Sequence, residues 1–174
     1  MNKYYNHFKS TVAGRDYIFH NVRKLLGGRP AKIMEIGSSR DLSFEARFSD
    51  GWSSYFWLEY IQIFGGQLDI FDIDQNALDN CKKLFEGSET PNINFICDDA
   101  VSHIKDNYDL IFLDGSDCPN EMLSQFEKID RTKSIILCDD FNSKGSLLSK
   151  KHKDFLLFYL ANTPFQMAVY PKLG

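Results

Sequence analysis

The stretch Ala31-Lys-Ile-Met-Glu-Ile-Gly37 decides the fold, because the apolar run at residues 32–36 predicts a short buried strand that ends in a glycine turn. Before it, apolar residues near helical spacing predict a first helix over residues 3–26, which two consecutive glycines end. After it, residues 53–64 predict a helix with a serine as its cap. A short strand between two helices predicts an α/β protein if the alternation continues along the chain.

The alternation does continue. Further strands are expected over residues 67–73, 92–97, 108–113, 134–138 and 165–170, and further helices over residues 76–85, 100–104, 121–129 and 151–160. Short apolar strands that alternate with helices predict a parallel sheet covered on both faces. Right-handed crossovers place the carboxyl ends of the strands at one edge, and ligands bind there, where the strand order reverses. The predicted fold class is α/β, with a Rossmann-like, doubly wound, mostly parallel sheet.

Length and composition narrow the organisation and the partners. The 174 residues favour one domain, with an N-terminal helical segment over residues 1–28 and a Rossmann-like core over residues 29–174. Hydrophobic residues make up 43% of the chain, which is enough for a real core. The net charge of −4 argues against a nucleic-acid partner, because affinity for phosphates comes mainly from clustered Lys and Arg.

Membrane and disulfide signals are absent from the sequence. It contains no run of about 20 apolar residues, so no membrane partner is expected. The four cysteines, Cys81, Cys97, Cys118 and Cys138, form no C-x-x-C pair, and their spacing suits neither zinc nor a disulfide scaffold. We therefore expect reduced, mostly buried thiols in a cytoplasmic protein.

Carboxylates follow five consecutive predicted strands. They are Glu35, then Asp72 and Asp74, then Asp98 and Asp99, then Asp114 and Asp117, and finally Asp139 and Asp140. One acidic residue at a strand end is common, because strands end at water. Five acidic strand ends in succession indicate a binding edge, since parallel strands bring all of them to the same side of the sheet.

The order of these elements resembles the class I S-adenosylmethionine-dependent methyltransferases over most of the chain. In that family an acidic residue and a glycine-rich turn end the first strand, and Glu35 and Gly37 match them. The resemblance implies that Asp72 holds the ribose hydroxyls of the cofactor, with Asp74 as the rival position, and that Asp99 receives the adenine amino group. A carboxylate suits the ribose because it accepts two hydroxyl protons.

The turn after the first strand departs from the family pattern. Gly37 is followed by Ser38-Ser39-Arg40-Asp41-Leu42-Ser43, with no second glycine nearby. In a compact alignment, Asp41 stands where a glycine is usual and Ser43 faces the methionine end of the cofactor. In the alignment that we prefer, residues 41–50 are an insertion, and Gly51-Trp52-Ser53-Ser54 completes the motif.

The insertion is preferred because 37 positions separate Glu35 from Asp72, and removing ten restores an ordinary length. The amides at the start of the helix near Ser53 then face the cofactor carboxylate, with which Arg40 could pair. The implied cofactor site comprises Glu35, Gly37, Ser38, Arg40, Gly51, Trp52, Ser53, Ser54, Asp72, Asp74, Asp99, Ala100 and Asp114.

Asp114, Asp139 and Asp140 resemble a narrower group, the catechol O-methyltransferase-like and macrolide-sugar O-methyltransferases. The resemblance implies that these three carboxylates hold Mg²⁺, which in turn holds substrate oxygens. Carboxylate oxygens suit this ion, and a bound metal lowers the pKa of a hydroxyl. Lys144 is the competing neutraliser of the three charges. The catechol enzymes have a lysine as general base where Asp117 stands, so Asp114, Asp117 or a metal-bound oxygen could be the base here.

The sequence thus predicts an O-methyltransferase for a small hydroxylated molecule, with S-adenosylmethionine and Mg²⁺ as cofactors. The alternative is a cofactor-binding module that acts within a larger assembly and has little activity alone. An NAD enzyme is disfavoured because no G-x-G-x-x-G turn follows the first strand. Nucleic-acid amino methylation is disfavoured because Asp114-Gly-Ser-Asp117 replaces an Asn/Asp-Pro-Pro-Tyr segment.

The end of the sheet gives one more expectation. The family's sheet usually has seven strands, whereas six are predicted here, so the last strand is expected to be missing. An exposed edge invites pairing with another chain. The protein is therefore expected to be either a homodimer through that edge or a truncated form.

Overall fold

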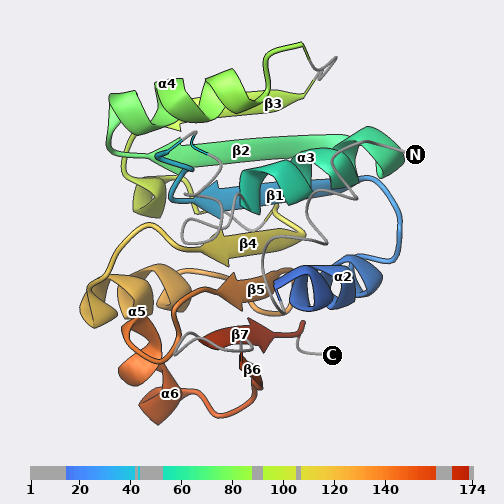
Figure 1. The fold of residues 1–174 in the computed structure, drawn as a ribbon. Coiled ribbons are helices and arrows are strands. Elements are labelled where there is room, and N and C mark those ends of the chain that lie inside the picture. The colour runs from blue at the N-terminus through green and yellow to red at the C-terminus, as the bar shows by residue number, and fades with distance from the viewer. Residues whose placement is uncertain are drawn as a thin grey trace.

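The computed structural model describes residues 15–41, 43, 53–87, 92–104, 107–159 and 166–172. Its strands form one sheet in the order β3-β2-β1-β4-β5-β7-β6 (Figure 1). The strands are β1 Ala31–Ile36, β2 Gly66–Asp72, β3 Ile93–Cys97, β4 Leu110–Leu113, β5 Ile135–Cys138, β6 Leu156–Tyr159 and β7 Gln166–Tyr170. The helices are α2 Arg15–Leu25, α3 Ser53–Phe64, α4 Gln75–Leu84, α5 Pro119–Glu127 and α6 Leu148–Lys151, with 3-10 turns η2 Ala100–Ser102 and η3 Lys144–Ser146.

The parallel strands β1 to β5 end at one edge of the sheet. β1 pairs with β2 and with β4, so Ile36 lies between Phe71 and Leu113. β4 pairs with β5 in the same direction, and Leu113 lies beside Cys138. The strand order reverses at β1, so the turns after β1 and β4 stand side by side at the place where α/β sheets bind ligands. The predicted α/β fold class with a mostly parallel sheet is confirmed.

Helices cover both faces of the sheet, and alternate strand residues supply a core to each face. α2, α3 and α4 pack on one face, with α2 and α3 towards the viewer in Figure 1, and meet Ile33, Leu68 and Phe112. α5 and α6 pack on the other face and meet Met34 and Ile111. Because side chains alternate between the faces of a strand, strands that are buried on both faces need nearly continuous apolar sequence.

The prediction of six strands is wrong, because the segment expected to be the last helix contains a seventh strand. Over the described residues 151–159 the structure has the last residue of α6 and then β6. β6 pairs antiparallel with β7, which in turn pairs antiparallel with β5. An apolar run such as Phe155-Leu-Leu-Phe-Tyr-Leu160 suits either helix or strand, and the edge of β7 offers it backbone partners. The argument for a homodimer or a truncated chain loses its basis, since it depended on a missing strand.

Most other elements lie within a few residues of their predicted bounds, and α3 has the predicted ones. The first helix is described from Arg15 onward. All four cysteines are free thiols, but only Cys81 and Cys138 are buried, so the expectation of mostly buried thiols holds for half of them. Among the residues that the structure describes, no helix is long and apolar enough to cross a membrane.

Gly37 brings the turns after β1 and β4 into backbone contact. Its φ is +94°, in the left-handed region, and its N–H donates a hydrogen bond to the carbonyl oxygen of Phe71 at 2.9 Å. A Cβ on Gly37 would lie 2.8 Å from the carbonyl oxygen of Asp114 and 2.9 Å from the Cα of Gly115. Only glycine both adopts this conformation without cost and allows so close an approach.

We predict that Gly37→Ala lowers the free energy of unfolding by about 2–4 kcal/mol, from the left-handed backbone and from the contact with the second turn. Urea denaturation measures the change. The matched control is Gly87→Ala, since Gly87 also has a positive φ, +80°, but no atom within 4 Å of the added Cβ. It should cost only about 1–2 kcal/mol. Equal losses in the two variants would show that the contact between the turns contributes nothing to stability.

Candidate functional site

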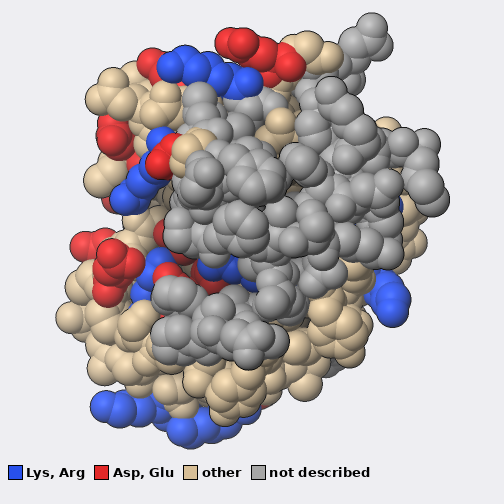
Figure 2. Space-filling view, viewed as in Figure 1, with Lys and Arg blue, Asp and Glu red and all other residues tan. Residues whose placement is uncertain are grey.

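Two cavities open at the carboxyl edge of the sheet. The larger one, of about 450 Å³, lies over the ends of β1, β2 and β3 and against α5. The smaller one, of about 180 Å³, lies over the ends of β4 and β5. Gly37, Gly115 and Ser116 line both, so ligands in the two cavities would meet at the turns after β1 and β4. In Figure 2, acidic and basic side chains lie side by side along the left rim, on the side where β1, β2 and β4 end in Figure 1.

Asp72 lines the larger cavity and is only 6% exposed. Its Oδ2 accepts hydrogen bonds from the backbone N–H of Ser38 at 3.0 Å and from the Ser38 hydroxyl at 2.8 Å. Its Oδ1 accepts one from the backbone N–H of Asp74 at 2.9 Å. These bonds fix the carboxylate and tie the turn after β1 to the end of β2. A carboxylate has about four acceptor positions, so Asp72 can still accept a hydrogen bond from a ligand hydroxyl.

The other wall of the larger cavity follows β3. Asp98, Asp99 and Ala100 line it, and Asp99 Oδ1 caps η2 by accepting a hydrogen bond from the N–H of Val101 at 2.9 Å. Asp98 Oδ2 lies 2.8 Å from Nε2 of His103, and this hydrogen bond lowers the pKa of Asp98. The wall is therefore acidic and offers acceptors to a ligand that carries hydroxyl or amino groups.

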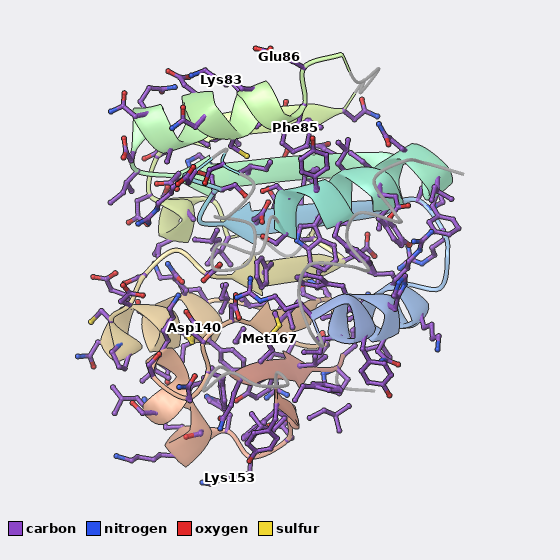
Figure 3. The ribbon with its side chains drawn as sticks, in the orientation of Figure 1. Lys83, Phe85, Glu86, Asp140, Lys153 and Met167 are labelled. Carbon is purple, nitrogen blue, oxygen red and sulfur yellow. The ribbon has the colours of Figure 1, made fainter. Side chains whose placement is uncertain are left out.

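Lys144 lies among the carboxylates of the smaller cavity. Its Nζ is 2.8 Å from Oδ1 of Asp114 and 3.5 Å from carboxylate oxygens of Asp117 and of Asp140. Figure 3 labels Asp140, which is the second residue after the end of β5. Burial opposes the charge of Lys144, but the attraction of Asp114 and of the other carboxylates outweighs it and raises the pKa of the lysine. Lys144 is therefore a buried ammonium in this cavity.

Arg15 supplies a second cation. It begins α2, is 6% exposed, and its Nη2 lies 2.6 Å from Oδ2 of Asp139, which is 1% exposed. Burial first, and then the charge of Asp114, raise the pKa of Asp139 to about 7 in spite of this ion pair. Burial likewise raises the pKa of Asp114 against the opposing effect of Lys144. The pair Asp114 and Asp139 thus holds a proton more readily than exposed carboxylates do.

The structure does not support the predicted Mg²⁺ site at Asp114, Asp139 and Asp140. Asp114 and Asp140 face the ammonium of Lys144, while Asp139 faces the guanidinium of Arg15. The described part of the chain contains no group of three His, Cys, Asp or Glu side chains arranged to hold a metal ion. The charges that motivated a metal are neutralised by the protein's own cations, so we derive no step through Mg²⁺.

The remaining predicted residues divide into three groups. Arg40 lines the smaller cavity with Ser38. Glu35, Ser53 and Ser54 are buried beside the cavities without lining either, and the Ser53 hydroxyl donates a hydrogen bond to Glu35, which ties the start of α3 to β1. Gly51 and Trp52 lie outside the described residues. α3 begins at Ser53.

Asp74 does not line the larger cavity, where a ribose ligand would be needed. It is exposed, and its Oδ1 caps α4 by accepting a hydrogen bond from the backbone N–H of Asn76 at 2.9 Å. Of the two rival carboxylates after β2, only Asp72 lines the larger cavity. The side chain of Asp117 is 99% exposed at the mouth of the smaller cavity, whereas that of Asp114 is 25% exposed.

Sequence reasoning missed several residues that line the cavities. Glu121, Ser124 and Gln125 of α5 line the larger cavity, and Arg15 lines the smaller one. The α5 residues had a signal, because the first turns of a helix that follows a parallel strand lie near the carboxyl edge. No signal in the sequence pointed to Arg15, because its partner Asp139 lies 124 positions away in the sequence.

Comparison with known proteins supports the fold but not a narrow family. No family model and no curated protein matches the sequence. A candidate rRNA methylase from Clostridium thermocellum is similar in structure, with a TM-score of 0.62 at 14% identity over 89% of this chain and 95% of the other. An rRNA methylase from Streptococcus thermophilus gives 0.58 at 12% identity over 89% and 96%. Human methyltransferase-like protein 13, in complex with S-adenosylhomocysteine, gives 0.56 at 14% identity over 87% and 78%.

The fold is that of the class I S-adenosylmethionine-dependent methyltransferases. These neighbours do not support the narrower resemblance to catechol O-methyltransferase-like or macrolide-sugar enzymes. They also correct the expected partners, a small molecule and no nucleic acid. Two of the neighbours carry the name of rRNA methylase, so a net charge of −4 does not exclude nucleic acid for a chain of this fold.

The raised pKa of Asp139 predicts a pH dependence of stability. The folded protein keeps the proton up to about pH 7, whereas an unfolded aspartate releases it near its ordinary value of 3.8. Between these values the folded state binds more protons, so the free energy of unfolding should fall as pH rises. In Asp139→Asn this fall should be less steep, by up to about 1.4 kcal/mol per pH unit.

Urea denaturation of both proteins at several pH values between about 4.5 and 7.5 measures the two slopes. The difference between the two slopes isolates the effect of Asp139, because the variant retains every other titrating group. An equally steep fall in Asp139→Asn would mean that Asp139 does not carry the proton, so that Arg15 keeps it ionised or Asp114 binds the proton instead.

Proposed function

We propose that this chain is an S-adenosylmethionine-dependent methyltransferase whose larger cavity holds the cofactor and whose smaller cavity receives the acceptor. The observation that carries the proposal is the position of Asp72, fixed by Ser38 and facing a cavity of about 450 Å³ at the point where the strand order reverses. Cavities that bind ligands of this size measure about 300–1,000 Å³. The residues fit the cofactor, because its ribose offers two hydroxyl donors and its adenine an amino donor to acidic walls.

The cofactor supplies, when bound, a methyl group on a positively charged sulfonium. Asp72 would hold the ribose hydroxyls, and Asp99 with Ala100 would border the adenine. Gly37, Gly115 and Ser116 line both cavities, so the methyl group and the acceptor atom would meet beside them. These residues act by position: they hold two reactants in line, which is the main requirement of a direct transfer.

We propose a hydroxyl oxygen as the acceptor atom and Asp114 as the group that takes its proton. Asp114 is partly exposed to the smaller cavity, and burial raises its pKa, which makes it a stronger base than an exposed aspartate. Asp117, at the mouth of the same cavity, is the second candidate for this role. The proposal concerns the acceptor atom and leaves open the size of the molecule that carries it.

Asp72→Asn should weaken the binding of S-adenosylhomocysteine by about 1–3 kcal/mol, the scale of a lost hydrogen bond to a charged group. Isothermal titration calorimetry measures it. Asp74→Asn is the matched control, because Asp74 is exposed outside the cavity and asparagine caps a helix as well as aspartate does. It should leave the affinity unchanged. If only Asp74→Asn weakens binding, then Asp74 and not Asp72 binds the ribose. If the unchanged protein does not bind S-adenosylhomocysteine, the proposal is refuted.

Transfer itself is tested with radiolabelled S-adenosylmethionine against two sets of acceptors, hydroxylated metabolites and total RNA. Label that appears in either set, and is lost in Asp114→Asn while S-adenosylhomocysteine binding is kept, supports the proposed base. Cofactor binding without transfer to any acceptor would favour the alternative, a cofactor-binding module that acts within a larger assembly.

A further inference from the structure

Lys144 is held in the middle of the acidic cluster by the way its own turn is built. The turn after β5 contains Asp140, whose φ of +45° is the only positive one among the described residues other than glycine. The carbonyl oxygen of Asp140 accepts a hydrogen bond from the N–H of Lys144 at 3.0 Å, and the carbonyl oxygen of Phe141 accepts one from the N–H of Gly145 at 3.0 Å. A strained residue that persists in a short turn indicates a constraint imposed by its surroundings.

Gly145 permits the return of the chain towards Asp114. A Cβ on this residue would lie 2.2 Å from the ring of Phe141, which is itself buried. The preceding residue, Lys144, is only 4% exposed, and its side chain reaches Asp114 at the end of β4. The turn thus fixes a lysine side chain, which is normally one of the most mobile, in a defined position.

We propose that Lys144 is the built-in cation of the acceptor cavity, occupying the place between Asp114, Asp117 and Asp140 where a divalent ion would otherwise bind. This inference rests on the proposed function, because only that proposal makes the smaller cavity the acceptor cavity. The position of Lys144 among the three carboxylates does not depend on it. It follows that methyl transfer by this chain needs no divalent ion, in contrast to what the acidic strand ends suggest from sequence alone.

The chemistry of an ammonium group fits this position. It has three protons, and three carboxylates face it at 2.8, 3.5 and 3.5 Å. A lysine fixed there repels a second cation, and a divalent ion at 2.0–2.6 Å from the same oxygens would have to displace it. Displacement would leave a buried ammonium without its partners, which is strongly unfavourable. The other cation of the cavity, Arg15, pairs with Asp139 and so adds to the repulsion.

Lys144 also leaves Asp114 usable. The ammonium hydrogen-bonds to Oδ1 of Asp114, while 25% of that side chain stays exposed to the cavity. An acceptor hydroxyl could therefore reach the carboxylate while Lys144 holds its orientation. A divalent ion on the same carboxylate would compete directly for those oxygens. Lys144 is in this sense a positioning residue for Asp114.

The experiment measures Mn²⁺ binding by electron paramagnetic resonance in the full chain, with S-adenosylhomocysteine affinity measured separately. The unchanged protein should bind no Mn²⁺ at this cluster. Lys144→Met, which keeps most of the length of the side chain but removes its charge, should bind Mn²⁺ at least about tenfold more tightly. The double variant Lys144→Met with Asp114→Asn should lose that gain, because one of the three ligands is gone.

Two results would overturn the inference. One is Mn²⁺ binding by the unchanged protein that Asp114→Asn abolishes, because the metal would then displace the lysine. The other is a folded Lys144→Met that gains no Mn²⁺ affinity. If Lys144→Met does not fold, the comparison of the unchanged protein with Asp114→Asn alone decides the matter. If the unchanged protein does not bind S-adenosylhomocysteine, the proposed function is refuted, but the Mn²⁺ results are unaffected.

Discussion

The contact between the turns after β1 and β4 is the constraint on which the site depends. Gly37 lies against the backbone of Asp114 and Gly115, closer than any side chain would allow. This contact brings the turn after β1 next to the turn after β4, and residues of both turns line the larger and the smaller cavity. In the proposed function, the same contact would bring the two ligands together.

Charge is distributed differently in the two halves. In the larger cavity the carboxylates are satisfied by neutral donors, as Asp72 is by Ser38 and by the backbone of Asp74, or are exposed to water. In the smaller cavity they lie against buried cations, since Asp139 pairs with Arg15 and the other carboxylates face Lys144. Neutral donors orient a carboxylate while leaving it able to accept further hydrogen bonds from a ligand. Buried ion pairs fix geometry more firmly, since breaking one leaves an uncompensated charge.

Sequence predicted the parallel part of the fold well and its end poorly, for a physical reason. The strands β1 to β5 are short apolar runs with turns at both ends, and their pattern depends on local sequence. The strand β6 cannot be recognised from local sequence, because Leu156–Tyr159 forms a strand only by pairing with β7, which follows it in sequence. The carboxylates that line the larger cavity were accessible in the same way. Asp72 and Asp99 stand directly after strands, so knowing the strands is nearly enough to place them.

The ion pairs of the smaller cavity could not be predicted, because they depend on which cations meet which carboxylates. Read alone, Asp114, Asp139 and Asp140 are as compatible with a metal ion as with a lysine, and only the path of the chain distinguishes them. Lys144 meets Asp114 across 30 positions and Arg15 meets Asp139 across 124. The decisive features, a positive φ at Asp140 and a glycine against the ring of Phe141, are properties of packing. Local sequence fixes where charges lie along a strand edge, whereas the contacts that neutralise them arise only on folding. The ion pairs of the smaller cavity therefore need the three-dimensional structure, whereas the carboxylates of the larger cavity can be located once the strands are known.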